Sequence, residues 1–346
     1  MWKRLSMAIL VIGALGLSAL PAQATFPGEN GVIAFRRFLN EDRTQGAVFT
    51  IRPNGTGERQ VTFPPPGFVD RNPDISPDGR RIAFEREGVD CGPDCSYDEI
   101  FTVKADGTQL TQLTHNPAGT SCFAGGYCNG SPAWSPDGRS IAFRRAAGPV
   151  VDDLVESQGI YIMRADGSGI RQITQTARPA LGEDTDPQWS PDGRKLVFQR
   201  WNVRTAQPLD GIALWVIDLR TGHERRVTPF PLSGGDTPDW SPDGQRILFH
   251  SSVNGPPDVS ANLYTVRPDG TGLHQLTFAQ GGSLQYLGSS YSPDGMSITV
   301  GRRPATGGTN ADVYVMRADG THIRQVTKTE LYDSYPDWGP APEDGH

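Results

Sequence analysis

The sequence contains few of the residues and motifs that enzymes commonly use for catalysis. Histidine occurs only 6 times in 346 residues, and no His-x-x-x-His pair is present to hold a zinc ion. The Gly-x-Ser-x-Gly turn that presents a nucleophilic serine in many hydrolases is also missing. We therefore expect a protein without covalent chemistry, while an enzyme that depends on a metal held by acidic ligands stays open.

Long apolar runs are missing from all but the N-terminus. There, two basic residues precede an apolar stretch at Met7–Leu20, and Ala22–Ala24 supplies the small residues of a cleavage site. The stretch is shorter than the ~20 residues that cross a bilayer as a helix. Residues 1–24 are thus predicted to be a secretion signal, and residues 25–346 a single exported domain, periplasmic or secreted.

Basic residues are outnumbered by acidic ones, 32 to 39, which gives a formal net charge of −7 at pH 7. Nucleic acids and anionic membranes are usually bound through a basic surface. The charge therefore argues against both as partners, and we expect a monomer with no membrane span.

Cysteine is scarce but even in number: Cys91, Cys95, Cys122 and Cys128 fall close together. An even count in an exported chain predicts disulfides. The local pairs Cys91–Cys95 and Cys122–Cys128 are favoured, and cross-pairing is the alternative. A four-thiolate zinc site is a further rival, although the spacing is irregular for one.

Repetition is the feature that the sequence has in abundance. The tetrapeptide Ser-Pro-Asp-Gly begins at Ser76, Ser135, Ser190, Ser241 and Ser292, at spacings of 59, 55, 51 and 51 residues. A period of this length indicates a propeller, a solenoid or another array. Proline presets the first turn residue and glycine takes the left-handed position, so each copy should close a tight hairpin.

A second motif follows each tetrapeptide. It consists of an apolar run, a glycine turn and a run that ends in threonine, as in residues 100–114. Short runs rich in β-branched and aromatic residues, bounded by glycine, proline and aspartate, are typical of strands. The two motifs together predict four antiparallel strands, which is the content of one propeller blade.

The two ends of the chain are expected to complete one another. A copy of the second motif near the N-terminus lacks a full first strand, whereas residues 333–340 form a first strand with nothing after it. Pairing of Gly31–Phe35 with Tyr335–Gly339 would complete that blade and close the ring. The predicted fold is an all-β, six-bladed propeller with four strands per blade.

The repeat resembles that of the TolB-like family of WD40-like propellers. The shared signature is Pro-x-Trp-Ser-Pro-Asp-Gly-(Arg/Lys)-x-Ile-Ala-Phe with a later Ala-Asp-Gly-Thr turn, over nearly all of residues 26–340. Two copies depart from it, with Ile75 in place of tryptophan and Ser289 in place of proline. The periplasmic TolB protein carries an α/β domain before its propeller, for which we expect no counterpart here. The resemblance implies the fold and leaves the activity open.

The strand order sorts the connections onto two rims. Turns between first and second strands, and between third and fourth, are short and share one rim. The opposite side, which we call the long-loop rim, carries the long connections, for example 87–99, 115–130 and 201–211. Variable loops on a rigid scaffold are where binding usually occurs.

Aromatic residues near the long-loop rim are the candidate partner contacts, because tyrosine and tryptophan are enriched at interfaces. They are Phe68, Phe123, Tyr127, Trp201, Tyr286, Tyr332 and Tyr335. Tryptophans at a repeated strand position are instead expected to pack between blades; these are Trp134, Trp189, Trp240 and Trp338.

Acidic and amide residues recur three positions before the proline of the first strand. They are Asp70, Asn129, Asp184 and Asp333, with Asp236 one place off. If first strands line a central channel, these side chains could form a ring of oxygen ligands for Ca²⁺ at its mouth. The alternative, favoured by the repetition itself, is that each side chain stabilises its own turn.

The predicted function is an exported, non-enzymatic binding or scaffold propeller that requires no cofactor. Its long-loop rim would engage a protein or peptide at the cell envelope or outside the cell. The alternative is a calcium-type propeller hydrolase, lactonase or lyase with its metal at the channel mouth.

Overall fold

The computed structural model describes residues 28–88, 98–117, 126–147, 157–175, 182–202, 212–229, 232, 234–251, 262–279, 284–304 and 310–342. All named elements within these ranges are β-strands. The predicted secretion signal, three of the four cysteines and Phe123 lie outside them.

Nowhere in the described ranges does a helix have the length and apolar character needed to cross a bilayer.

Four sheets stand alone, and each has four strands that pair in the order of the chain. All their pairings are antiparallel. The strands are β8 (Tyr127–Trp134), β9 (Ser140–Ala147), β10 (Ser157–Arg164) and β11 (Arg171–Gln172); β12 (Gly182–Trp189), β13 (Lys195–Asn202), β14 (Ile212–Asp218) and β15 (Glu224–Arg226); β16 (Gly234–Trp240), β17 (Ile247–Ser251), β18 (Asn262–Val266) and β19 (His274–Gln275); and β20 (Leu284–Tyr291), β21 (Ser297–Pro304), β22 (Asp312–Arg317) and β23 (Arg324–Gln325).

The fifth sheet has eight strands and contains both ends of the described chain. Its order is β24-β1-β2-β4-β5-β6-β7, with β3 beside β2. The strands are β1 (Asn30–Phe38), β2 (Gly46–Ile51), β3 (Arg59–Gln60), β4 (Phe68–Ile75), β5 (Arg81–Gly88), β6 (Asp98–Lys104), β7 (Thr111–Gln112) and β24 (Tyr332–Pro340). The expected six separate four-stranded sheets are therefore not observed, because a single parallel bridge between Gly46 and Val69 joins β2 to β4.

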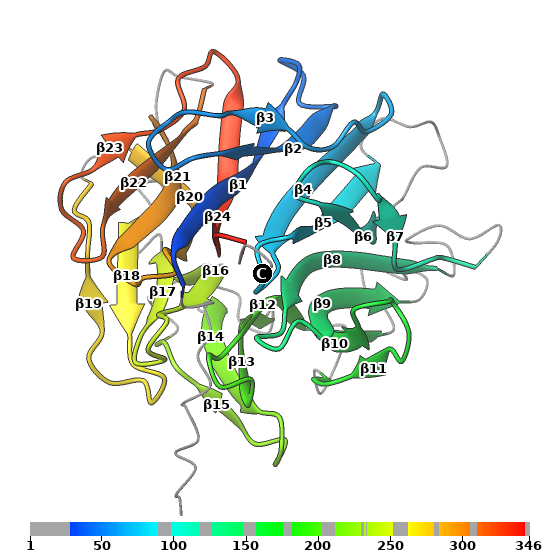
Figure 1. Ribbon diagram of the computed structural model, residues 1–346. Coiled ribbons are helices and arrows are strands. Elements are labelled where there is room, and N and C mark those ends of the chain that lie inside the picture. Colours follow the sequence, from blue (N-terminus) through cyan, green and yellow to red (C-terminus); the bar gives the residue numbers. More distant parts are fainter. Residues whose placement is uncertain are drawn as a thin grey trace, which may run out of the picture.

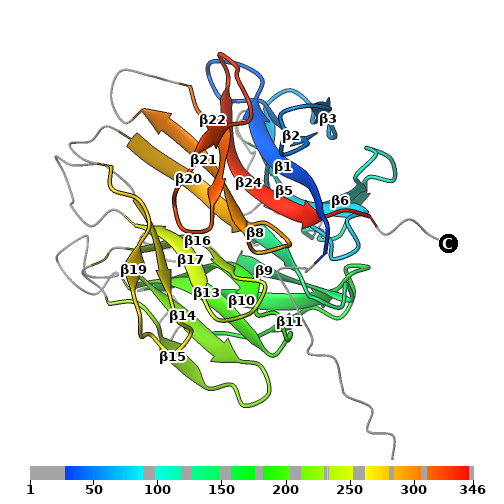
Figure 2. The same ribbon diagram turned by 60° about the vertical axis from the view of Figure 1, so that its left-hand side comes forward.

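The sheets are arranged around a centre as in a propeller. Figure 1 shows the first strand of each repeat, β4, β8, β12, β16, β20 and β24, nearest that centre, with the later strands farther out. Figures 1 and 2 both show β24, in red, beside β1, in blue. The two strands are antiparallel, with Ile33 opposite Trp338, so the predicted pairing of the two chain ends is confirmed.

The Ser-Pro-Asp-Gly turns form as predicted. In the first copy, Gly79 has a φ of +67° and its N–H donates to the carbonyl oxygen of Ser76 at 2.8 Å. The Asp78 carboxylate accepts from Ser76 Oγ at 2.6 Å and from the Arg80 N–H at 3.0 Å. The other four copies repeat these bonds, so the polar groups of the tetrapeptide are used within the turn itself.

The threonine that ends each second motif has a structural role. The N–H of Val48, on the third strand of its repeat, donates to Thr62 Oγ1 at 2.9 Å, and the same bond recurs in the other five copies of the motif. The hydroxyl thus satisfies a buried backbone donor at a point where the fourth strand has already ended.

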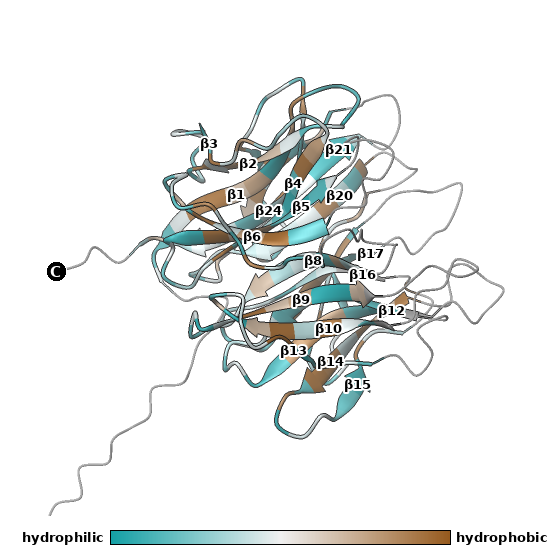
Figure 3. Cartoon of the chain, turned by 90° about the vertical axis from the view of Figure 1, so that its right-hand side faces the viewer, coloured by the Kyte–Doolittle hydropathy of each residue, from teal (hydrophilic) through white to brown (hydrophobic). Residues whose placement is uncertain are grey.

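The apolar core lies between neighbouring sheets. One cluster joins Val197 and Val216 of the β12–β15 sheet to Trp240 and Phe249 of the next. Trp134 and Trp338 occupy equivalent clusters, which confirms their predicted packing role, and Trp189 packs partly buried against a fourth. In Figure 3 brown segments fall within strands such as β6, β10 and β14, whereas the outermost strand β15 is teal.

Removal of β24 tests ring closure. A chain that ends at Thr327 lacks β24, which pairs with one edge of β1, and lacks the buried Trp338 side chain. We therefore expect Tm to fall by at least about 10 °C, or the protein to aggregate. Thermal unfolding followed by circular dichroism measures this. A chain that ends at Pro342 keeps β24 and is the matched control; equal Tm values for the two truncations would contradict a ring closed by β24.

Candidate functional site: the central channel and its long-loop mouth

Each innermost strand has a bulge where it borders the central channel. In five of these strands the residue before the proline has a left-handed backbone conformation: Asn72 (φ 50°), Ser131 (49°), Asp186 (49°), Thr237 (44°) and Tyr335 (52°). The sixth strand has Ser289 in place of the proline, and the residue before it is Gly288 (φ 75°). This conformation costs a non-glycine residue about 1–2 kcal/mol, and such strain is concentrated at functional sites. The bulges are therefore the first indication of a site at the channel.

The departure of one copy from the repeat follows from this geometry. Gly288 and Ser289 stand where the other innermost strands have a larger residue followed by proline. A Cβ at Gly288 would lie 2.7 Å from the Cα of Tyr335. Backbone that close cannot give way cheaply, so this strand uses glycine.

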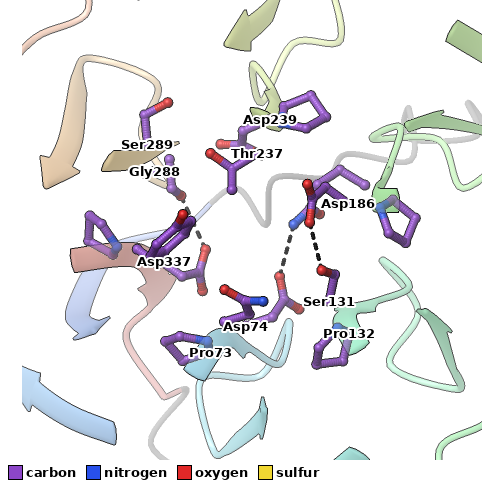
Figure 4. A pocket seen from close by; sticks show the side chains of 17 residues that line it. Pro73, Asp74, Ser131, Pro132, Asp186, Thr237, Asp239, Gly288, Ser289 and Asp337 are labelled. Atoms are coloured by element: carbon purple, nitrogen blue, oxygen red, sulfur yellow. Dashed lines mark hydrogen bonds between the residues drawn. The ribbon is translucent and has the colours of Figure 1, made fainter. Parts of the chain in front are cut away.

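The bulges surround a cavity of about 70 Å³ on the channel axis. Figure 4 shows Asp74, Asp337 and Thr237 around it, from three different strands. Asp74 accepts from the Trp134 N–H at 2.7 Å, and Asp337 accepts from the Ile75 N–H at 2.7 Å.

A third aspartate, Asp239, makes the equivalent bond with the Tyr291 N–H at 2.7 Å. Each of the three donors lies on the next innermost strand around the ring. The channel carboxylates therefore tie these strands to one another.

Burial perturbs all three channel carboxylates. Desolvation raises the pKa of Asp239 to about 7 and that of Asp337 to about 6. Desolvation, followed by repulsion from Asp337, raises the pKa of Asp74 well above its ordinary value. The channel therefore gains negative charge between weakly acidic and neutral pH.

This titration predicts a pH dependence of stability. The folded state holds its proton on Asp239 up to about pH 7, whereas the unfolded chain releases it near pH 4. The free energy of unfolding should therefore fall as pH rises from 4 to 7. Relative to Asp239→Asn, the wild type should lose roughly 2 kcal/mol between pH 5 and pH 8 in urea unfolding. Asp42→Asn, at an exposed position, is the control; parallel pH profiles for wild type and Asp239→Asn would contradict the assignment.

The residues predicted to bind a metal lie elsewhere. Asp70, Asp184 and Asp333 are fully buried, and each forms an ion pair with an arginine on the second strand of its own repeat. Asn129 makes the corresponding bond, accepting from Arg145 Nε at 2.7 Å. The backbone of Asp236 lies opposite His250.

The hypothesis of a ligand ring at the channel mouth is therefore wrong for Asp70, Asn129, Asp184 and Asp333. The favoured alternative, that each side chain stabilises its own turn, is also corrected, because each bonds an arginine of the adjacent strand. No three His, Cys, Asp or Glu side chains gather closely enough to hold a metal within the part of the chain that is described. The physical reason is the neighbouring strand: each side chain bonds a buried or partly buried arginine there, so its repeated position serves packing.

The sequence contained the signal for these pairs, which the prediction missed. A Phe-x-Arg pattern recurs in the second strand, as in Phe84-Glu85-Arg86. The arginine lies over the aromatic rings of its own sheet, with the Arg86 guanidinium carbon 4.8 Å from the centre of the Phe101 ring. It then bonds the acidic residue opposite, Asp70, at 2.6 Å.

Removal of one partner should reveal the cost of such a pair. Asp184→Ala would leave the Arg200 charge largely buried, with Glu224 as its remaining ion-pair partner among the described residues, and should lower the free energy of unfolding by about 2–3 kcal/mol. Asp184→Asn should cost about 1 kcal/mol, because Asn129 already fills this role in the neighbouring sheet. Urea unfolding of the two variants measures both costs, and an alanine variant as stable as the wild type would contradict a structural role.

The predicted rim aromatics differ in their exposure. Trp201, at the end of β13, is 45% exposed, and Phe68, Tyr127 and Tyr335 are half-buried. Tyr286 and Tyr332 pack within apolar clusters and are 5% and 8% exposed. The last two are corrected from surface contacts to core residues, because Tyr286 packs with Leu248 and Leu263 of the preceding sheet, and Tyr332 packs with Phe38 and Ala311.

A second cavity, of about 180 Å³, adjoins the channel on its long-loop side. It shares Asn72, Ser131, Asp186 and Tyr335 with the channel lining. Its other lining residues are Arg36, Arg71, Glu85, Arg144 and Thr185. Three arginines from different repeats thus meet at the mouth of the channel, and no pattern in the sequence predicted this.

Cys128 lies in β8, is 2% exposed and is disulfide-bonded. The pairing of the cysteines stays a prediction, because the other three lie outside the described residues.

Known proteins resemble this chain in sequence and in architecture. A curated relative, the protein TolB homolog of Chlorobium luteolum, is 30% identical over 290 residues, which cover 76% of this chain and 62% of the relative. The crystal structure of TolB from Acinetobacter baumannii superposes with a TM-score of 0.65 at 18% identity, over 90% of this chain and 67% of that one. This chain is a TolB-like propeller.

The similarity covers only part of that relative, and it extends to the fold of an enzyme. The TolB-like propeller spans less than two thirds of the length of that curated relative, and no protein-family model matches it. An enzyme has a related fold: oligogalacturonate lyase in complex with manganese superposes with a TM-score of 0.50 at 18% identity, over 88% of this chain and 74% of that one. At such identity the likeness to solved structures concerns the fold alone.

Proposed function

We propose that this TolB-like propeller is an exported binding module that holds a protein or peptide partner at its long-loop rim, without covalent chemistry. The observation that carries the proposal is the channel mouth. There, strained bulges and three arginines surround two adjoining cavities on a closed ring of strands. A preformed concave site with a few convergent polar groups is the usual form of a binding pocket.

We also infer that the ring has six blades, with the eight-stranded sheet counting as two. Its halves, β24-β1-β2-β3 and β4-β5-β6-β7, each have four antiparallel strands. An apolar cluster joins Ala34 and Val48 of one half to Ile82 and Phe84 of the other. Separate sheets elsewhere in the ring pack together in the same way.

Export is part of the same proposal. Residues 1–24 would direct the chain to the periplasm or outside the cell, and the rest would form one domain. The disulfide at Cys128 supports this, because such bonds persist in oxidising compartments.

A metal-dependent enzyme is the second candidate. The observation in its favour is the pair Asp74 and Asp337 beside the channel cavity, whose mutual repulsion a cation such as Ca²⁺ would relieve. Both carboxylates already accept hydrogen bonds from neutral groups of the ring, which gives them a structural role without any ion.

Crosslinking from within the cell separates the two candidates. A photoreactive amino acid at Trp201 should capture a partner protein, because this side chain is 45% exposed on the long-loop rim. The same residue at Met296, which is 72% exposed on the short-turn rim, is the matched control and should capture none.

A calcium titration by calorimetry completes the test. Saturable binding by the wild type that is lost in Asp74→Asn, together with no adduct at Trp201, would favour the enzyme. Equal adducts at Trp201 and Met296 would contradict a partner site specific to the long-loop rim.

A further inference from the structure

Arg36 differs from the paired arginines of the ring. Its side chain is buried, and the residue is 8% exposed. One terminal nitrogen, Nη2, donates to the hydroxyl of Ser334 at 2.7 Å, while the buried Nε has no hydrogen-bond partner among the described residues. Its neighbour in sequence, Arg37, instead bonds two carboxylates, those of Glu58 and Asp333.

Two aromatic rings hold the Arg36 guanidinium. Its carbon lies 4.4 Å from the centre of the Phe38 ring and 4.9 Å from that of Tyr335. Contacts of this kind stabilise a cation, but they leave the N–H donors in the guanidinium plane unsatisfied. A buried donor without an acceptor is costly, and more so when the group is charged.

Arg36 lines the 180 Å³ cavity on the long-loop side of the channel. The other two arginines there are neutralised by this chain: Arg71 pairs with Glu85 at 2.6 Å, and Arg144 pairs with Glu183 at 2.7 Å.

Among the described residues, the remaining charges near the cavity do not provide Arg36 with a close partner. Arg71 also pairs with Glu87 at 2.8 Å, and Asp186 accepts from Ser131 Oγ at 2.6 Å. Desolvation lowers the pKa of Arg36, the interaction with Tyr335 opposes this, and the charge of Arg71 lowers it further. Arg36 therefore lines the cavity and has no carboxylate partner of its own among the described residues.

We propose that this cavity receives a carboxylate from the partner peptide and that Arg36 is the residue that anchors it. A guanidinium donates two parallel bonds to a carboxylate, and these charge-assisted bonds are the strongest of their kind in proteins. The cavity is several times larger than the ~30 Å³ that one water molecule occupies, so an acidic group with part of its stem can enter. The inference rests on the proposed function, since it specifies what the long-loop rim binds.

The carboxylate could belong to an acidic side chain or to the end of a chain. Three peptides separate these sources: acetyl-Ala-Glu-Ala-amide, its glutamine analogue, and acetyl-Ala-Ala-Ala with a free carboxyl end. The readout is the ¹⁵N resonance of Arg36 Nε in the full-length protein. We expect saturable displacement of that resonance by one or both of the carboxylate peptides and none by the glutamine peptide.

Variants test whether Arg36 itself is responsible. Arg36→Gln should weaken binding of the active peptide at least about tenfold, as expected for loss of a charge-assisted bond. Arg303→Gln is the matched control and should bind normally, since this arginine lies on the same rim but bonds the neutral Gln285 at 2.7 Å. If Arg36→Gln does not fold, the resonance of the wild type alone decides the question.

Several outcomes would overturn the proposal. Equal displacement by the glutamate and glutamine peptides would show that charge is not recognised. Displacement by galacturonate but by neither acidic peptide would assign the cavity to an acidic sugar. An unmoved resonance alongside a specific Trp201 adduct would refute the carboxylate site and leave the binding function intact, whereas loss of both would refute both.

Discussion

The structure depends on the pairing of its two ends. A propeller sheet that begins with β1 would expose an unpaired edge at the channel unless another strand covered it, and β24 does so over nearly the whole length of β1. The closing strand also brings Trp338 into the core and Asp337 and Tyr335 into the channel. Closure therefore assembles the candidate site in the same step as it completes the fold.

Once the ring is closed, its polar groups divide into two sets. Asp70, Asp184 and Asp333 are bound to arginines inside their own sheets and serve stability. The groups beside the channel, such as Asp74 and Arg36, have fewer partners to offset their burial. The pKa of Asp74 is raised, and Nε of Arg36 has no hydrogen-bond partner among the described residues. Buried groups with incomplete compensation are typical of sites that meet a ligand.

The likeness to other propellers is consistent with this division. The turn bonds of Ser-Pro-Asp-Gly and the threonine bonds at the strand ends use backbone donors and the side chains of the motif itself. Such bonds leave the channel lining free to vary, so one architecture can occur both in TolB and in a manganese-bound lyase. The family therefore establishes the scaffold, while the function must be argued from Arg36, Asp74 and their neighbours.

The sequence by itself determined the strands, the tight turns and the pairing of the chain ends, because each depends on local propensity and a visible repeat. It also placed the aspartates along the chain and held, in the Phe-x-Arg pattern of the second strand, a signal for their arginine partners. Whether Asp184 faces a channel or the Arg200 guanidinium is decided by the register of the adjacent strand and by the bulge before Pro187. The burial of Tyr286, the joining of β2 to β4 and the meeting of Arg36, Arg71 and Arg144 likewise arise only when separate repeats pack together.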